Sequence, residues 1–285
     1  MTVAILGSAG QLGRDLLALR PAIALTRSDI DLSQPESIRP ALEKHRPTVL
    51  VNCAAYNLVD KAEADPAPAM TVNFHGVREL AKACGELGIK LVHFGTDYVF
   101  GLPSDNAVSL LSESDPPGPL SVYGLSKLAG EYAVRQFCPQ HLVLRTCGLY
   151  GVWGSGGKGT NFIETMLKLA GLGKALNVVN DQHCTPSYTK DIAEATWALI
   201  DREANGLFHV TNAGSTTWHD LAKECFFQTQ TAANLSPTTT AAYGAPAARP
   251  PYSVLSCDKL AKLGITLRPW PDALRAYLAE RRARG

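Results

Sequence analysis

The sequence predicts an α/β protein built on a doubly wound parallel sheet, and three observations support this fold class. Short apolar segments of strand type alternate with helical patterns six times before residue 150. The first of these strands runs directly into a glycine-rich turn and a helix. Beyond residue 150 the composition changes. We therefore expect one domain over residues 1–150 and a smaller one over 151–285, with some later elements returning to the first domain.

The composition is that of an ordinary globular protein with a substantial core. The 285 residues include 46% hydrophobic and 19% charged side chains, and the net charge of +1 gives no electrostatic basis for nucleic-acid binding. No apolar run reaches the roughly 18 residues that span a bilayer, and no signal peptide is visible. The seven cysteines stand singly, without a Cys-x-x-Cys pair. These features predict a cytoplasmic protein without membrane contact, disulfide framework or metal site.

The glycine-rich turn predicts a dinucleotide site. Gly7, Gly10 and Gly13 follow the strand at residues 2–6 and precede a helical pattern. Glycine is needed there because backbone N–H groups at the start of the helix must approach a pyrophosphate closely. Glycine-rich turns without a ligand are also frequent, but this strand–turn–helix order is typical of a Rossmann-type domain.

The end of the second strand bears on the cofactor. The strand near residues 23–25 ends at Arg27, and Asp31 and Leu32 follow in a turn that we place beside the adenine. An acid at this point binds a free 2′-hydroxyl, whereas an arginine accommodates a 2′-phosphate. Arg27 therefore favours NADPH, while the nearby acids leave NADH open.

Two further strands end in small or polar residues. The apolar segment 48–52 runs into Ala54, Ala55 and Tyr56, and the segment that begins at residue 91 ends in Thr96 and Asp97. Ligands of open parallel sheets bind beyond the carboxyl ends of the strands. Thr96 and Asp97 are therefore expected beside a substrate, although a threonine that only caps its strand remains an alternative.

A tyrosine and a lysine four residues apart are the candidate catalytic pair. If residues 121–131 are helical, Tyr123 and Lys127 share one helix face. A phenol has a pKa of about 10, and a nearby ammonium favours its ionised form. On its own, the pair is also typical of an amphipathic helix with a solvated lysine. The glycine turn and Thr96 upstream favour the catalytic interpretation.

The remaining segments are predicted from composition. Residues 101–120 and 148–159 are typical of loops, and the second, which holds Trp153, is typical of a lid or substrate loop. Residues 229–251 are rich in Ala, Thr and Pro and predict an exposed connection. A final helix is expected over about 271–284.

The set of motifs resembles the extended short-chain dehydrogenase/reductases and, more narrowly, the dTDP-4-dehydrorhamnose reductase family. The segments that carry this resemblance run in the family's order and are 7–13, 52–56, 59–63, 95–100, 122–131, 144–146, 161–162, 179–182, 206–209 and 216–219. They span the chain from its start to about residue 220. Residues 249–255 resemble a family element more loosely.

The resemblance implies reduction of a 4-keto sugar carried on dTDP, with dTDP-L-rhamnose as the product. It implies that Tyr123 supplies a proton, that Lys127 holds the nicotinamide ribose and lowers the tyrosine pKa, and that Thr96 hydrogen-bonds the carbonyl oxygen. Asp97 would help to seat the sugar. The cofactor residues implied by the motifs are Gly7, Gly10, Gln11, Leu12, Gly13, Arg27, Asp31, Leu32, Ala54, Ala55, Tyr56, Tyr123 and Lys127.

Two departures from the family pattern leave alternatives open. Position 148 is glycine, whereas family members typically carry a tryptophan there that packs on the sugar. Trp153 is the candidate substitute for this tryptophan. Another nucleotide-linked 4-keto sugar is therefore an alternative substrate. Asp15 and Lys190 stand where some members bind magnesium between subunits, and a lysine is no metal ligand at neutral pH. A homodimer without magnesium is still an alternative.

The alternative from another class of protein is a non-catalytic NADP-binding subunit, similar to the β subunit of methionine adenosyltransferase. Such a subunit does not require Thr96, Tyr123 and Lys127.

Overall fold

A six-stranded parallel sheet takes five strands from residues 3–146 and the sixth from residues 206–209. The computed structural model describes residues 1–101, 109–154 and 160–284. The strand order is β2-β1-β3-β4-β5-β8, and every neighbouring pair is parallel. The strands are β1 (Val3–Leu6), β2 (Ile23–Leu25), β3 (Val49–Asn52), β4 (Lys90–Thr96), β5 (His141–Thr146) and β8 (Gly206–His209). The chain order reverses beside β1, which is the switch point where such sheets bind ligands.

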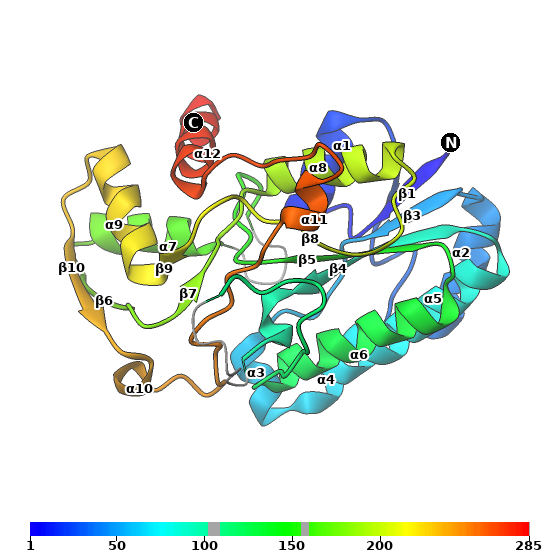
Figure 1. Ribbon diagram of the computed structural model, residues 1–285, viewed down its shortest axis with the longest axis horizontal. Coiled ribbons are helices and arrows are strands. Elements are labelled where there is room, and N and C mark those ends of the chain that lie inside the picture. The colour runs from blue at the N-terminus through cyan, green and yellow to red at the C-terminus, as the bar shows by residue number, and fades with distance from the viewer. Residues whose placement is uncertain (102–108, 155–159, 285) are drawn as a thin grey trace.

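Helices cover both faces of this sheet, as Figure 1 shows. One face packs against α1 (Gln11–Leu19), α8 (Thr189–Asp201) and α11 (Asp258–Ala261), and its buried core includes Leu16 and Ile192. The other face packs against α2 (Ile38–His45), α5 (Val77–Glu86) and α6 (Val122–Phe137). β1 and β3 are buried along their whole length, as expected for strands covered on both sides. The predicted α/β fold class is confirmed.

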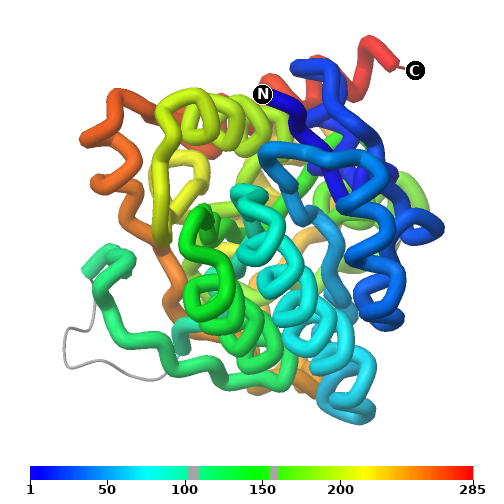
Figure 2. The backbone as a smooth tube through the Cα atoms, turned by 90° about the vertical axis from the view of Figure 1, so that its right-hand side faces the viewer, coloured from blue at the N-terminus to red at the C-terminus, as the bar shows by residue number. Residues whose placement is uncertain are grey.

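The helical run before β4 is not one regular helix. It consists of α4 (Pro66–Met70), a π-helical turn (Thr71–Gly76) and α5, and Figure 2 shows this run beside α6. Buried Asn73 lies in the π turn, where its amide bonds the backbone of Tyr56 on both sides and donates to Ser126 of α6 at 3.0 Å. The irregular turn therefore fixes the segment that follows β3, which borders the site.

The later part of the chain supplies a second group of elements. They are α7 (Phe162–Gly171), β6 (Ala175–Val179), β7 (His183–Cys184), β9 (Thr216–Thr217), α9 (Trp218–Thr229), β10 (Asn234–Thr238), α10 (Thr240–Tyr243) and α12 (Trp270–Ala283). β10 pairs in parallel with β6, and β7 pairs with β9 antiparallel. Figure 1 shows most of this group beyond the sheet, whereas α8, β8 and α11 return to it. Short α3 (Val59–Ala64) and 3₁₀ turns at 35–37 and 97–99 complete the described elements.

Two predictions about connecting segments have different outcomes. The exposed connection predicted for residues 229–251 is wrong in part, because residues 234–238 form β10. The sequence pattern hides this strand, since Pro237 lies within it and pairing with β6 stabilises it. The lid predicted for residues 148–159 falls partly on 155–159, outside the described residues, as does 102–108 of the other loop. Within the described chain, no helix is long and apolar enough to cross a membrane.

Candidate active site

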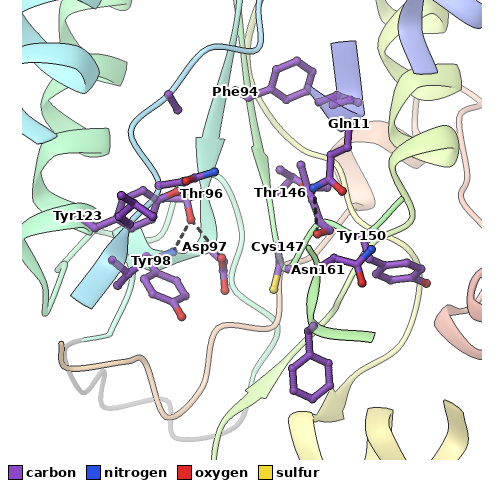
Figure 3. A pocket seen from close by; sticks show the side chains of 18 of the residues that line it. Gln11, Phe94, Thr96, Asp97, Tyr98, Tyr123, Thr146, Cys147, Tyr150 and Asn161 are labelled. Carbon is purple, nitrogen blue, oxygen red and sulfur yellow. Dashed lines mark hydrogen bonds between the residues drawn. The ribbon is translucent and has the colours of Figure 1, made fainter. Parts of the chain in front are cut away.

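A large pocket opens at the carboxyl ends of the strands. Its volume is about 1050 Å³, and its walls come from the glycine turn, the ends of β3, β4 and β5, the start of α6, and α7, β6 and α9. Figure 3 shows part of the lining, with Thr96, Asp97 and Tyr123 on one side and Gln11 and Thr146 on the other. The sequence-predicted residues that border it are Gly7, Gly10, Gln11, Leu12, Gly13, Arg27, Ala54, Ala55, Thr96, Asp97, Tyr123 and Lys127.

The glycine turn has the geometry of a dinucleotide site. Gly7 has a φ of +77°, and a Cβ there would stand 2.7 Å from the Ala54 nitrogen. A Cβ on Gly13 would stand 2.5 Å from the Gly7 carbonyl oxygen, so neither position accepts a side chain. Gly10 is the N-cap of α1 and provides no side-chain acceptor to the helix start. The N–H groups and positive end of the helix dipole are thus open to an anion, and these residues fit a dinucleotide pyrophosphate.

Thr96 and Tyr123 lie close together because β4 ends, and α6 begins, at the same edge of the sheet. Thr96 is the last residue of β4 and is 6% exposed, and its hydroxyl accepts from the Tyr98 backbone at 3.2 Å. Ser121 caps α6 by accepting from the Gly124 backbone at 3.1 Å, which places Tyr123 in the first helical turn. The Tyr98 and Tyr123 rings contact edge to face at 5.7 Å, and this contact restrains the phenol at the pocket.

The structure corrects the expected electrostatics of the tyrosine. Burial raises the pKa of Tyr123 to about 12, and a hydrogen bond with Thr96 opposes this only in part. The pKa of the tyrosine is therefore raised rather than lowered as predicted. The ammonium of Lys127 donates to the Phe94 carbonyl at 2.5 Å. The ring borders the pocket and keeps some contact with solvent. A phenol of this kind remains protonated at neutral pH and suits a proton donor better than a base.

Lys127 is a buried cation inside the pocket wall. It is 3% exposed, and burial lowers its pKa to about 8, while the carboxylate of Glu131 one helical turn away opposes this shift. The carboxylate is in turn paired with Arg145, at 2.8 Å between Oε2 and Nη2. The lysine therefore stays charged at neutral pH in a site where charge is weakly screened.

Asp97 is held by a segment that is distant in sequence. It is 2% exposed, and Ser253 donates to its Oδ2 at 2.6 Å. Burial raises the pKa of this carboxyl, and the hydrogen bond from Ser253 opposes the shift. Arg249 of the same late segment also borders the pocket and pairs with Asp60 at 2.9 Å. Sequence reasoning missed both residues, for which the loose resemblance over 249–255 was the sole signal.

Trp153 does not lie with the other predicted substrate residues. Its indole nitrogen donates to Asp15 of α1 at 2.8 Å, and the guanidinium groups of Arg14 and Arg284 lie over its ring, at 5.3 and 3.8 Å. It does not border the pocket. The Asp15 carboxylate and the two guanidinium groups thus hold the indole ring outside the pocket.

Three predicted cofactor residues lie beside the pocket without bordering it. Leu32 is 3% exposed and belongs to the core on the α2–α5 face. Asp31 binds Arg27, with 2.9 Å between Oδ2 and Nε, and Tyr56 is fixed through its backbone by Asn73. Arg27, the partner of Asp31, does border the pocket. The predicted adenine contacts of Asp31 and Leu32 therefore remain proposals.

The two positions compared with a magnesium site have protein partners. Asp15 is 3% exposed and accepts from Thr189 at 2.5 Å as well as from Trp153. Lys190 lies 3.5 Å from the carboxylate of Glu280. Among the described residues, no group of three or more His, Cys, Asp or Glu side chains is arranged for a metal ion.

A dinucleotide turn that shares one pocket with a threonine, a tyrosine and a lysine defines an oxidoreductase of the extended short-chain dehydrogenase/reductase class. Comparison with known proteins narrows this class. Residues 1–283 match the family described as the RmlD substrate binding domain. The chain belongs to this family, that of the dTDP-4-dehydrorhamnose reductases.

Individual relatives are similar over nearly their whole length. The chain is 37% identical to dTDP-4-dehydrorhamnose reductase of Salmonella typhimurium, with 98% of each chain covered. It is 39% identical to dTDP-4-keto-6-deoxy-D-glucose reductase of Streptomyces niveus, covering 95% of this chain and 94% of the relative. A crystal structure of dTDP-4-dehydrorhamnose reductase from Bacillus anthracis in complex with NADP superposes with a TM-score of 0.91 at 32% identity, covering 98% of this chain and all of that one.

Proposed function

We propose that this protein is an NADPH-dependent reductase of a dTDP-linked 4-keto-6-deoxysugar, and that its substrate is dTDP-4-dehydro-L-rhamnose. The convergence of Thr96, Tyr123 and Lys127 in the pocket of the glycine turn carries the proposal. The names of the relatives support the chemistry, and the NADP in the Bacillus anthracis structure supports the cofactor. The seven cysteines are free thiols, which supports a cytoplasmic setting.

The chain's own residues divide the work of the reaction. NADPH supplies the hydride that adds to the C4 carbonyl carbon of the sugar. Thr96 donates a hydrogen bond to the carbonyl oxygen, and Tyr123 donates its proton to the same oxygen as negative charge develops. The ammonium of Lys127 binds the nicotinamide ribose. Ser253 orients Asp97, whose carboxyl binds a sugar hydroxyl.

The glycine at position 148 and the name of one relative together give a second candidate substrate. Gly148 has a φ of +50°, and a Cβ there would stand 3.0 Å from the Trp218 ring and 3.2 Å from the Pro186 Cα. Trp218 therefore forms this part of the pocket wall, and a side chain at position 148 would be strained and would crowd it. A dTDP-4-keto-6-deoxy-D-glucose, as named for the Streptomyces niveus relative, is the second candidate.

A direct assay separates the two substrates. Purified protein is mixed with NADPH and either dTDP-4-dehydro-L-rhamnose or dTDP-4-keto-6-deoxy-D-glucose, and the loss of NADPH absorbance is followed. Faster oxidation with the rhamnose precursor, with dTDP-L-rhamnose as the product, is the expected result. A higher kcat/KM with the glucose derivative would reassign the sugar. No oxidation with either sugar would overturn the proposed activity.

Replacing Arg27 by alanine is expected to raise the KM for NADPH about tenfold while leaving the KM for NADH unchanged. Charge-assisted hydrogen bonds of this kind contribute about 1.5–3 kcal/mol, and the lower part of this range applies because the side chain is 80% exposed. Steady-state kinetics with both cofactors check this. Arg275→Ala, which removes a similarly paired surface arginine near Asp272, is the matched control. Equal effects on NADPH and NADH would contradict a role at the 2′-phosphate.

The pKa of Lys127 predicts a pH dependence of cofactor use. The side chain is charged below about pH 8 and neutral above it, so the attraction for the anionic cofactor is lost as the pH rises. We expect kcat/KM for NADPH to fall through about pH 8, because this parameter follows groups of the free enzyme. Lys127→Met should give a low, flat profile. A wild-type profile that stays flat to pH 9.5 would contradict the assignment.

A further inference from the structure

Two buried polar atoms beside the pocket have no hydrogen-bond partner among the residues that the structure describes. The Oε1 atom of Gln11 and the Oγ1 atom of Thr146 are both shielded from solvent and bond to none of the described residues. Both side chains belong to residues that border the pocket. A third such atom, the Tyr150 hydroxyl, is set among the rings of Tyr188 and Tyr277. Buried polar groups are nearly always paired, so unpaired ones at a pocket indicate a ligand.

The chemistry of the two atoms defines what they bind. The amide nitrogen of Gln11 donates to the Leu149 carbonyl at 3.2 Å, and a carbonyl only accepts, so the amide is oriented and Oε1 is left as an acceptor. The hydroxyl of Thr146 both donates and accepts. A primary carboxamide, which has N–H donors and one carbonyl acceptor, satisfies both.

The two side chains come from the glycine turn and from the carboxyl end of β5. Gln11 is the first residue of α1, directly after the glycine turn. Thr146 ends β5 and is the register partner of Thr96 on β4. Figure 3 shows Gln11 and Thr146 across the pocket from Tyr123. A cofactor that extends from the glycine turn toward Tyr123 passes both side chains.

We propose that Gln11 and Thr146 bind the carboxamide of the nicotinamide ring and so determine which face of the ring is turned toward Tyr123. The inference rests on the proposed use of NADPH. The nicotinamide end carries the one primary carboxamide among the groups of NADPH and a dTDP-sugar. The link from Gln11 to Leu149 also joins the helix that faces the pyrophosphate to the loop after β5, so the pyrophosphate and the nicotinamide are positioned from one side chain.

Binding measurements test this without turnover. Thr146→Val keeps the shape of the side chain and removes the hydroxyl, and Gln11→Met removes the amide. Each variant is titrated with NADPH and with 2′-phospho-ADP-ribose, which lacks the nicotinamide. We expect the Kd for NADPH to rise about three- to tenfold and the Kd for the fragment to stay within about twofold. Because the 3-acetylpyridine analogue of NADPH has no amide N–H, Gln11→Met should weaken its binding much less.

The control and the contrary outcomes keep the inference separate from the proposed function. Thr196→Val is the matched control, because Thr196 is fully buried in α8, bonds its own helix at the Ile192 carbonyl, and lies outside the pocket. Equal losses for NADPH and the fragment, or none for either, would overturn the carboxamide site. A wild-type protein that binds neither NADPH nor the fragment would instead reject the proposed function.

Discussion

Replacing Tyr123 by phenylalanine should lower kcat by about 10²–10⁴-fold, the usual contribution of a positioned proton donor. The substitution removes one hydroxyl and keeps the ring that contacts Tyr98, so the pocket should retain its shape. Since the pKa of Tyr123 is raised to about 12, the phenol holds its proton at neutral pH until negative charge develops on the substrate oxygen. The Kd for NADPH should change by less than about twofold.

Turnover under saturating NADPH and sugar measures this effect, and fluorescence titration measures cofactor binding. Tyr132→Phe is the matched control, because Tyr132 is on the same helix and is 49% exposed. It should keep full activity. A Tyr123→Phe enzyme with near-normal kcat would exclude Tyr123 as the proton donor. A parallel loss of NADPH binding would mean that the hydroxyl acts mainly in cofactor binding.

Those parts of the site that depend on neighbouring residues could be predicted from the sequence. Gly7 and Gly13 are required by backbone contacts within one strand–turn–helix unit, and these contacts are local. Tyr123 and Lys127 share a face because a helix repeats every 3.6 residues. Thr96 reaches the pocket because parallel strands end at one edge of the sheet.

The partners that come from distant parts of the chain could not be predicted in the same way. Ser253 and Asp97 are 156 positions apart, and their hydrogen bond depends on how the segment after α10 crosses the pocket. Composition describes this segment only as rich in alanine and proline. No periodicity marks an arginine such as Arg249 as a pocket residue, since its orientation is determined by pairing with Asp60.

Trp153 and the tyrosine pKa illustrate a second limit. A tryptophan in a glycine-rich loop suits a sugar site, but Asp15 supplies a hydrogen-bond acceptor and Arg284 a cation, and together they hold the ring elsewhere. Spacing alone suggests that Lys127 acts on Tyr123. The outcome instead depends on burial, which a spacing rule does not contain.

The ion pair behind Lys127 gives the largest predicted effect on stability. Glu131 and Arg145 are each 2% exposed and are joined by three hydrogen bonds, of which the shortest is 2.8 Å. Glu131→Gln would leave the guanidinium of Arg145 buried without a counter-charge. A guanidinium cannot lose its proton to relieve this cost. We expect the free energy of unfolding to fall by about 3–5 kcal/mol. Urea denaturation at pH 7 measures this change.

Arg145→Met should cost less, about 1–3 kcal/mol, because a stranded carboxylate can take up a proton. Burial already raises the pKa of Glu131 against the opposing effect of Arg145, and removing the arginine raises it further. Above about pH 4.3, the Glu131 carboxyl of this variant then holds its proton more tightly in the folded state than in the unfolded chain. The free energy of unfolding should therefore fall as the pH rises. Glu131→Gln has no carboxyl at this position and should show no such slope. Asp201→Asn, which breaks the exposed pair with Arg20, is the control and should cost at most about 1 kcal/mol. Equal costs for the two buried substitutions would contradict this account of the pair.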